Sequence, residues 1–145
     1  MKSLDTNILL YALNCDCPEH ETCRSLVESA LSEAEQWVIA DQVWFELYRL
    51  LRNHAVLEKP LTAAQAAEAI DWYRNRSGWL RCAWETDMME KVEALWKHKD
   101  FPARRCFDAQ MAIVLNENGV TEFYTRNVRD FKGFGFFRLV DPLGA

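Results

Sequence analysis

Apolar positions along the chain recur with two different spacings, and the change between them predicts strands separated by helices. Short apolar runs bounded by polar residues indicate buried strands, whereas apolar residues three and four positions apart indicate amphipathic helices. Strands are predicted to end at Leu4 and to cover 37–40, 79–84, 123–125 and 137–140. Helices are predicted after Asp5 and over 18–35, 42–52, 63–75, 87–98 and 104–117. Asp41 and Thr62 are the expected N-caps of two of these helices, and Asn118-Gly119 is the expected end of the last.

Strands that alternate with helices are typical of a mainly parallel sheet covered on both faces, with right-handed crossovers. We therefore expect an α/β fold, a three-layer α/β/α arrangement around a central, mainly parallel sheet of four to five strands. With 145 residues, half of them hydrophobic, the chain can bury one core, so a single domain over 1–145 is expected. Ligands bind such sheets at the carboxyl ends of the strands. Asp5 and the segment 125–127 follow two of these ends.

Charge and apolar content limit the classes of protein that fit. The net charge is −5, but residues 1–48 carry nine acids and two bases, and the remainder carries thirteen acids and fifteen bases. A phosphate-binding surface is therefore expected in the later segments. The longest apolar run, Ile8 to Leu13, has six residues, far below the roughly 20 that a membrane span needs. No signal peptide is visible, and an odd number of cysteines, five, suits a reducing compartment. We expect a cytoplasmic protein without membrane contact.

Three acids are candidate site residues: Asp5, Glu46 and Asp108. Asp5 follows the end of the first strand, and Glu46 and Asp108 lie on apolar helical stripes, where burying a carboxylate costs free energy. Each has a simpler explanation: Asp5 and Asp108 could cap helices, and Glu46 could turn toward solvent. Several buried carboxylates without matching bases would repel each other unless a divalent cation neutralised them. Oxygen ligands favour Mg²⁺ or Mn²⁺ over zinc.

A second metal hypothesis rests on Cys15, Cys17, His20 and Cys23, four soft ligands within nine residues. Their spacing matches none of the usual zinc motifs, which separate two ligand pairs by a longer loop. The favoured interpretation is a loop and a first helical turn, with Cys23 packing as a small hydrophobic residue.

Four segments carry motifs that occur together, in this order, in one known family. They are Leu-Asp-Thr-Asn-Ile-Leu-Leu-Tyr-Ala at 4–12, Phe-Glu-Leu at 45–47, Arg-Cys-Phe-Asp-Ala-Gln-Met-Ala at 105–112 and Tyr-Thr-Arg-Asn-Val-Arg-Asp-Phe at 124–131. The chain resembles PIN-domain ribonucleases, and most closely the VapC-type toxins of bacterial toxin–antitoxin pairs. The resemblance implies a PIN-like fold, a Mg²⁺- or Mn²⁺-dependent endoribonuclease that inhibits translation, RNA as substrate and an antitoxin protein as partner.

By the same resemblance Asp5, Glu46 and Asp108 occupy the three principal acidic positions and are the expected metal ligands. Glu46 would hold a second ion or orient the attacking water. At the fourth position many members have an acid, where this chain has Asn127. An amide can bind a metal or water through its oxygen but brings no charge. Asn127 is the positional match, and Asp130 is the other candidate for the missing carboxylate.

Further residues near the motifs are weaker candidates. Thr125 could orient a ligand or a water through its hydroxyl, or could simply bond to the backbone. Asn7, which belongs to the first motif, is another weaker candidate for the site. Basic residues near the late motifs are expected to hold RNA phosphates: Arg104, Arg105, Arg126, Arg129 and Lys132.

Two alternatives concern the assembly and the activity. Aromatic residues on two helices are expected to include an interface with a second copy or with the antitoxin: Trp44, Tyr48, Trp72 and Tyr73. The alternative to a nuclease is a non-catalytic PIN-like module that binds RNA or protein, which the amide at position 127 keeps open.

Overall fold

The computed structural model describes residues 1–98 and 100–144. Its strands are β1 (Lys2–Leu4), β2 (Val38–Ala40), β3 (Leu80–Cys82), β4 (Glu122–Tyr124) and β5 (Arg138–Val140). They pair in parallel in the orders β1-β4-β5 and β2-β3. A parallel bridge between Lys2 and Trp37 connects the two groups, which gives the overall order β3-β2-β1-β4-β5. The prediction of a mainly parallel sheet of four to five strands is confirmed.

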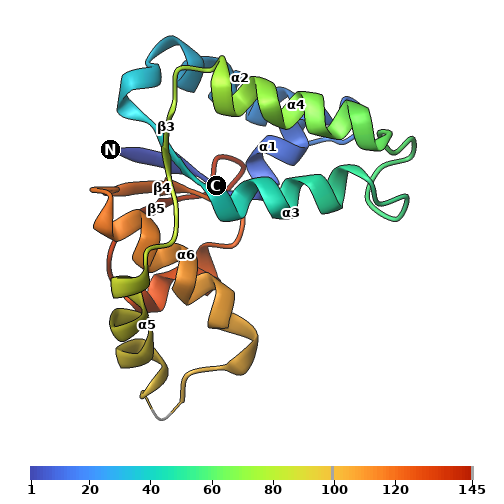
Figure 1. Cartoon of the computed structure of the whole chain (residues 1–145). Helices are drawn as coiled ribbons and strands as arrows, with labels where there is room; N and C mark the ends of the chain where they lie inside the picture. Colours follow the sequence, from blue (N-terminus) through green and yellow to red (C-terminus); the bar gives the residue numbers. More distant parts are fainter. Residues whose placement is uncertain (99, 145) are drawn as a thin grey trace.

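Helices cover both faces of this sheet. They are α1 (Thr6–Leu13), α2 (His20–Ser32), α3 (Asp41–Leu51), α4 (Ala63–Asn75), α5 (Met89–Trp96), α6 (Cys106–Glu117) and α7 (Val128–Phe131). Short 3-10 turns cover Ala34–Gln36, Thr86–Met88, Ala103–Arg105 and Lys132–Phe134. Helices α1 to α4 lie on one side of the strands and α5 and α6 on the other (Figure 1). The three-layer prediction is therefore confirmed.

Helix ends follow local sequence signals in most places. The Thr62 hydroxyl accepts from the Gln65 N–H at 3.2 Å, and the Gln65 side chain accepts from the Thr62 N–H, a reciprocal cap that fixes the start of α4. Gly119, with φ of 79°, ends α6 in the left-handed conformation that glycine adopts without strain. The prediction that Asp41 is an N-cap is wrong. Asp41 is the first residue of α3, and Ala40 occupies the N-cap position without a side-chain hydrogen bond.

Two predicted helices are shorter than their apolar stripes suggested. The stripe over 18–35 forms α2 and then a separate 3-10 turn, and the stripe over 87–98 begins with a 3-10 turn before α5. Helix α7 had no counterpart in the sequence prediction, because four residues are too few for an apolar repeat to show.

The core lies between the sheet and its helices and positions the carboxyl ends of β1 and β4. Leu4, Ile8, Leu47, Met111 and Phe123 are among its fully buried side chains. Register pairs the last residue of β1 with the last residue of β4, and the N–H of the next residue, Asp5, donates to the Tyr124 carbonyl at 2.9 Å. The first motif and the last are thus adjacent. No helix within the described residues is long and apolar enough to cross a membrane.

Candidate active site

Asp5 lies where β1 ends and α1 begins, and it is 6% exposed. Its Oδ1 accepts from the Thr6 N–H at 2.8 Å, and its Oδ2 accepts from the Thr125 hydroxyl at 2.6 Å. The first bond makes Asp5 the N-cap of α1. The cap and the candidate site are therefore compatible, because the two oxygens face different partners.

Glu46 projects from α3 toward α1 and is half-buried. The Thr6 hydroxyl donates to its Oε2 at 2.7 Å, and the Gln42 amide donates to its Oε1 at 3.2 Å. The same Gln42 nitrogen donates to the Phe107 carbonyl in the first turn of α6, also at 3.2 Å. Glu46 is therefore not turned freely into solvent: both of its oxygens are held, and Gln42 joins its helix to the helix of Asp108.

Asp108 is half-buried in the first turn of α6, on the face that carries the buried Met111, Ala112 and Leu115. The cap explanation for Asp108 is wrong, because the N-cap of α6 is Arg105, which makes no side-chain cap bond. The three acids thus approach one another from three helices, as the apolar stripes suggested.

Burial and mutual repulsion change the acidity of two of these groups. Burial, followed by the nearby charges of Glu46 and Asp108, raises the pKa of Asp5 to about 6, although hydrogen bonds from Thr125 and Thr6 oppose the rise. Burial also raises the pKa of Asp108 to about 6, with the charge of Asp130 as the next cause. Carboxylates whose ionised forms are disfavoured by burial and mutual repulsion are chemically suited to bind a cation.

The acids do not, as placed, form a finished metal site. Over residues 1–98 and 100–144, no three His, Cys, Asp or Glu side chains come together closely enough to hold an ion. Donors from Thr6, Thr125 and Gln42 bond to the carboxylate oxygens of Asp5 and Glu46. The donor set, made of carboxylates alone, fits Mg²⁺ or Mn²⁺.

Asn127 and Asp130 occupy different places relative to the acids. Asn127 is exposed, and its backbone N–H donates to the Thr125 hydroxyl at 2.9 Å. Asp130 lies on α7, is partly buried, and exerts the largest charge effect on Asp108. Thr125 is fully buried, and its hydroxyl donates to Asp5 and accepts from the Asn127 backbone N–H. The backbone interpretation of Thr125 is therefore confirmed. The unforeseen helix α7 is what brings Asp130 toward Asp108.

Three of the four arginines expected to bind phosphate are engaged within the protein. Arg126 makes two bonds to Asp141, at 3.0 and 2.9 Å, and its backbone N–H donates to the Asn7 side-chain oxygen at 3.4 Å. Arg104 pairs with Asp130 at 3.2 Å, and Arg105 donates to the Asp130 carbonyl. Arg129 is exposed and has no ion pair within the part of the chain that the structure describes.

The cysteine-rich segment has its own partners. The Cys17 thiol donates to the Asn14 carbonyl at 3.2 Å, and the His20 ring bonds to the Tyr11 carbonyl at 3.0 Å. Cys23 is fully buried, as expected for a small hydrophobic residue. These bonds explain the segment as the structured entry to α2.

The exposed aromatic residues agree only in part with those expected. Tyr48 and Trp72 are exposed, whereas Trp44 and Tyr73 are buried, and Phe45 and Phe107, which were not expected, are 78% and 66% exposed. Each of these phenylalanines is next in sequence to a site acid, and consecutive residues on a helix point about 100° apart. Helical spacing alone does not decide their exposure, because Leu47 and Ala109, the other neighbours of these acids, are fully buried.

Comparison with known proteins agrees with this geometry. A family model described as PIN domain matches residues 3–132. Ribonuclease VapC24 of Mycobacterium tuberculosis is 40% identical over 143 residues, 99% of this chain and 97% of that protein. The crystal structure of M. tuberculosis VapC20, described as a sarcin–ricin loop cleaving toxin, superposes with a TM-score of 0.70 at 21% identity, over 94% of this chain and 96% of that one. A toxin–antitoxin complex from Klebsiella pneumoniae gives a TM-score of 0.65 at 19% identity over the full length of both chains.

The two solved structures support the fold, and the family model and the 40% identical relative support the class. The chain belongs to the PIN-domain family and, within it, to the VapC ribonucleases. The predicted family and the prediction of a toxin–antitoxin endoribonuclease are confirmed. The alternative of a non-catalytic binding module is not favoured.

Proposed function

We propose that residues 1–145 form one domain whose Asp5, Glu46 and Asp108 carry out divalent-metal-dependent hydrolysis of RNA. The observation that carries this proposal is a continuous series of side-chain bonds from Thr125 through Asp5, Thr6, Glu46 and Gln42 to the carbonyl beside Asp108. It joins the carboxylates of Asp5 and Glu46 and ends one residue before Asp108. The charges of Glu46 and Asp108 both act on Asp5. A fold does not need mutually repelling acids near one another, so their proximity supports a catalytic role.

Mg²⁺ or Mn²⁺ would be held by Asp5 and Asp108, with Glu46 as a further ligand. When bound, such an ion draws charge from the phosphate and makes an attacking water more acidic. The protein's own part is orientation. Thr6 and Thr125 keep Asp5 in one rotamer, and Glu46, held from both sides, can accept a hydrogen bond from the attacking water. Asp130 completes the acidic set, and the exposed Asn127 lies outside it.

Substrate and partner follow from the family and from the surface. Arg129 and Lys132, both exposed, are placed to hold RNA phosphates beside Asp130.

A groove of about 530 Å³ between α3 and α4, lined by Trp44, Phe45, Tyr48 and Ile70, suits an antitoxin segment. Exposed Phe107, Trp96 and Met89 form an apolar surface suited to a second copy of the chain. Five unpaired cysteines favour the cytoplasm.

An RNA cleavage assay tests the metal and the acids together. Mg²⁺ and Mn²⁺ are titrated separately into the protein, Asp5→Asn and Asp71→Asn, the last being a matched change of an exposed acid on α4. We expect metal-dependent cleavage by the protein and by Asp71→Asn, and at least a 100-fold loss for Asp5→Asn. Equal activity in all three proteins, or cleavage undiminished in EDTA, would contradict the proposal.

A further inference from the structure

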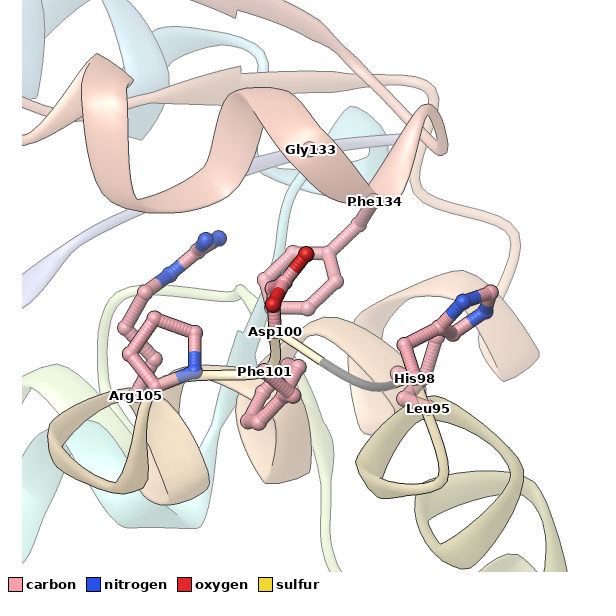
Figure 2. Close-up of a pocket in the computed structure, with 8 residues that line it drawn as sticks. Leu95, His98, Asp100, Phe101, Arg105, Gly133 and Phe134 are labelled. Carbon is pink, nitrogen blue, oxygen red and sulfur yellow. The ribbon is translucent and has the colours of Figure 1, made fainter.

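A cavity of about 530 Å³ opens on the surface near the amino end of α6. Two segments far apart in sequence line it. One contributes Asp100, Phe101 and Arg105, and the other contributes Gly133 and Phe134. Figure 2 shows these side chains around the cavity. Nothing in the catalytic proposal accounts for it.

The cavity adjoins the acidic site through one side chain. Arg105 lies three residues before Asp108, and its guanidinium donates to the backbone carbonyl of Asp130. Asp130 in turn exerts the largest charge effect on Asp108. The charge of Arg105 also acts on Asp108, so a ligand in the cavity would contact a side chain close to the acidic site.

The lining combines the planar rings of two phenylalanines with the planar guanidinium of Arg105. The guanidinium carbon of Arg105 lies 4.9 Å from the ring centre of Phe134 and 5.9 Å from that of Phe101. Both rings are only half-buried, so part of each remains accessible. Proteins bind unstacked bases on such aromatic rings and on arginine planes.

The charged side chains that line the cavity favour a nucleobase over a bare phosphate as its ligand. Asp100 and Arg105 both line the cavity and carry opposite charges, so the lining offers little net attraction to a bare phosphate. The Asp100 carboxylate can accept hydrogen bonds from the amino or imino groups of a base. Lys132, which is exposed and next in sequence to the lining residue Gly133, can meet the phosphates outside.

We propose that this cavity binds one nucleobase of the RNA substrate next to the phosphate that is cleaved, with Phe101 and Phe134 providing the stacking surface. The inference rests on the proposed ribonuclease function and deepens it, because it gives the enzyme a place to read a base.

Binding in EDTA tests the base pocket separately from hydrolysis. The probes are fluorescein-labelled RNA tetramers of A, C, G or U and an abasic tetramer of equal charge, followed by fluorescence anisotropy. We expect at least one base-containing tetramer to bind about 10-fold more tightly than the abasic one. Phe101→Leu should remove that advantage without weakening abasic binding, and Phe101→Trp should keep it. Trp72→Leu, which changes an exposed aromatic residue on α4, is the matched control.

Equal binding of all five tetramers, or an equal loss of base and abasic binding in Phe101→Leu, would overturn the pocket. Hydrogen–deuterium exchange of the unaltered protein gives an independent measurement. The tightest tetramer should protect amides at 101–105 and 133–134 beyond the protection by the abasic one, and protection confined to other segments would count against the proposal. Base-dependent binding without metal-dependent cleavage would refute the nuclease proposal alone, whereas cleavage with base-independent binding would refute the pocket alone.

Discussion

The Thr6 hydroxyl donates a 2.7 Å hydrogen bond to Glu46, while the backbone N–H of the same residue donates to Asp5. One buried residue at the first turn of α1 therefore orients two of the three acids. Because Thr6 is fixed by the helix and by its burial, the two carboxylates are set relative to each other before any ligand arrives.

Replacing Thr6 tests this orientation. Thr6→Val preserves the shape of the side chain but removes the donor to Glu46. A hydrogen bond to a charged group contributes about 1.5–3 kcal/mol, so cleavage should fall about 10- to 150-fold. Thr6→Ser, which keeps the hydroxyl, should retain most of the activity. The measurement is the single-turnover cleavage rate at saturating Mn²⁺, and a rate unchanged in Thr6→Val would show that the bond is dispensable.

Gln42 is expected to position Glu46 and the first turn of α6 without contacting the RNA phosphate itself. Its amide donates both to Glu46 and to the Phe107 carbonyl, so Gln42→Leu should release α3 from the first turn of α6. We expect kcat to drop about 5- to 50-fold and Mn²⁺ affinity to weaken, with little change in KM. Gln36→Leu, at an exposed position, is the control. A change in thermal stability without a change in Mn²⁺ affinity would assign Gln42 a purely structural role.

The raised pKa of Asp5 has a consequence for stability without metal. Because the folded state holds this proton more tightly than the unfolded state, protonation stabilises the fold fully below about pH 4, and that contribution is lost as pH rises through about 6. A shift from 3.8 to about 6 corresponds to about 3 kcal/mol. Asp5→Asn keeps an N-cap but never ionises. It should be more stable than the unaltered protein at pH 7.5 and similar to it at pH 4.

Thermal unfolding in EDTA at both pH values measures that difference. Mn²⁺ should raise the melting temperature of the unaltered protein more than that of Asp5→Asn, since an ion bound only to the folded state stabilises it. A stability difference that is the same at pH 4 and pH 7.5 would contradict the assigned ionisation.

Replacing Asp130 should reduce RNA cleavage far more than replacing Asn127. Asp130 is the acid that most affects Asp108, whereas the Asn127 side chain is exposed. Asp130→Asn should lower cleavage about 100-fold and weaken Mn²⁺ binding, and Asn127→Ala should lower cleavage less than about 5-fold. Isothermal titration with Mn²⁺ accompanies the rate measurement. The reverse order of effects would make Asn127 the fourth site residue.

Salt should weaken cleavage, because RNA binding that neutralises phosphates releases counterions. Raising salt from about 50 to about 200 mM should therefore reduce kcat/KM several-fold. Arg129→Ala should make the dependence shallower, since Arg129 is exposed and unengaged by the described acids. Arg126→Ala should leave the slope unchanged, because Arg126 is paired with Asp141. Identical slopes in the protein and in Arg129→Ala would remove Arg129 from the phosphate contacts.

Local patterns were sufficient for the order of the strands and of every helix except α7, for the helix ends at Thr62 and Gly119, and for the choice of Asp5, Glu46 and Asp108 as candidate site acids. Periodicity and capping act over a few residues, so a single chain displays them directly. The family could also be recognised from four short segments, because each keeps its acids at a fixed spacing from apolar neighbours.

Tertiary structure decided which groups meet. The pairing of β1 with β4 places Asp5 against Thr125, and Gln42 reaches Phe107 across 65 positions of sequence. Helix α7 carries Asp130 toward Asp108, and Arg126 is drawn to Asp141 and away from the predicted phosphate role. Such pairings depend on strand register and on the packing of distant helices, and no local repeat encodes them.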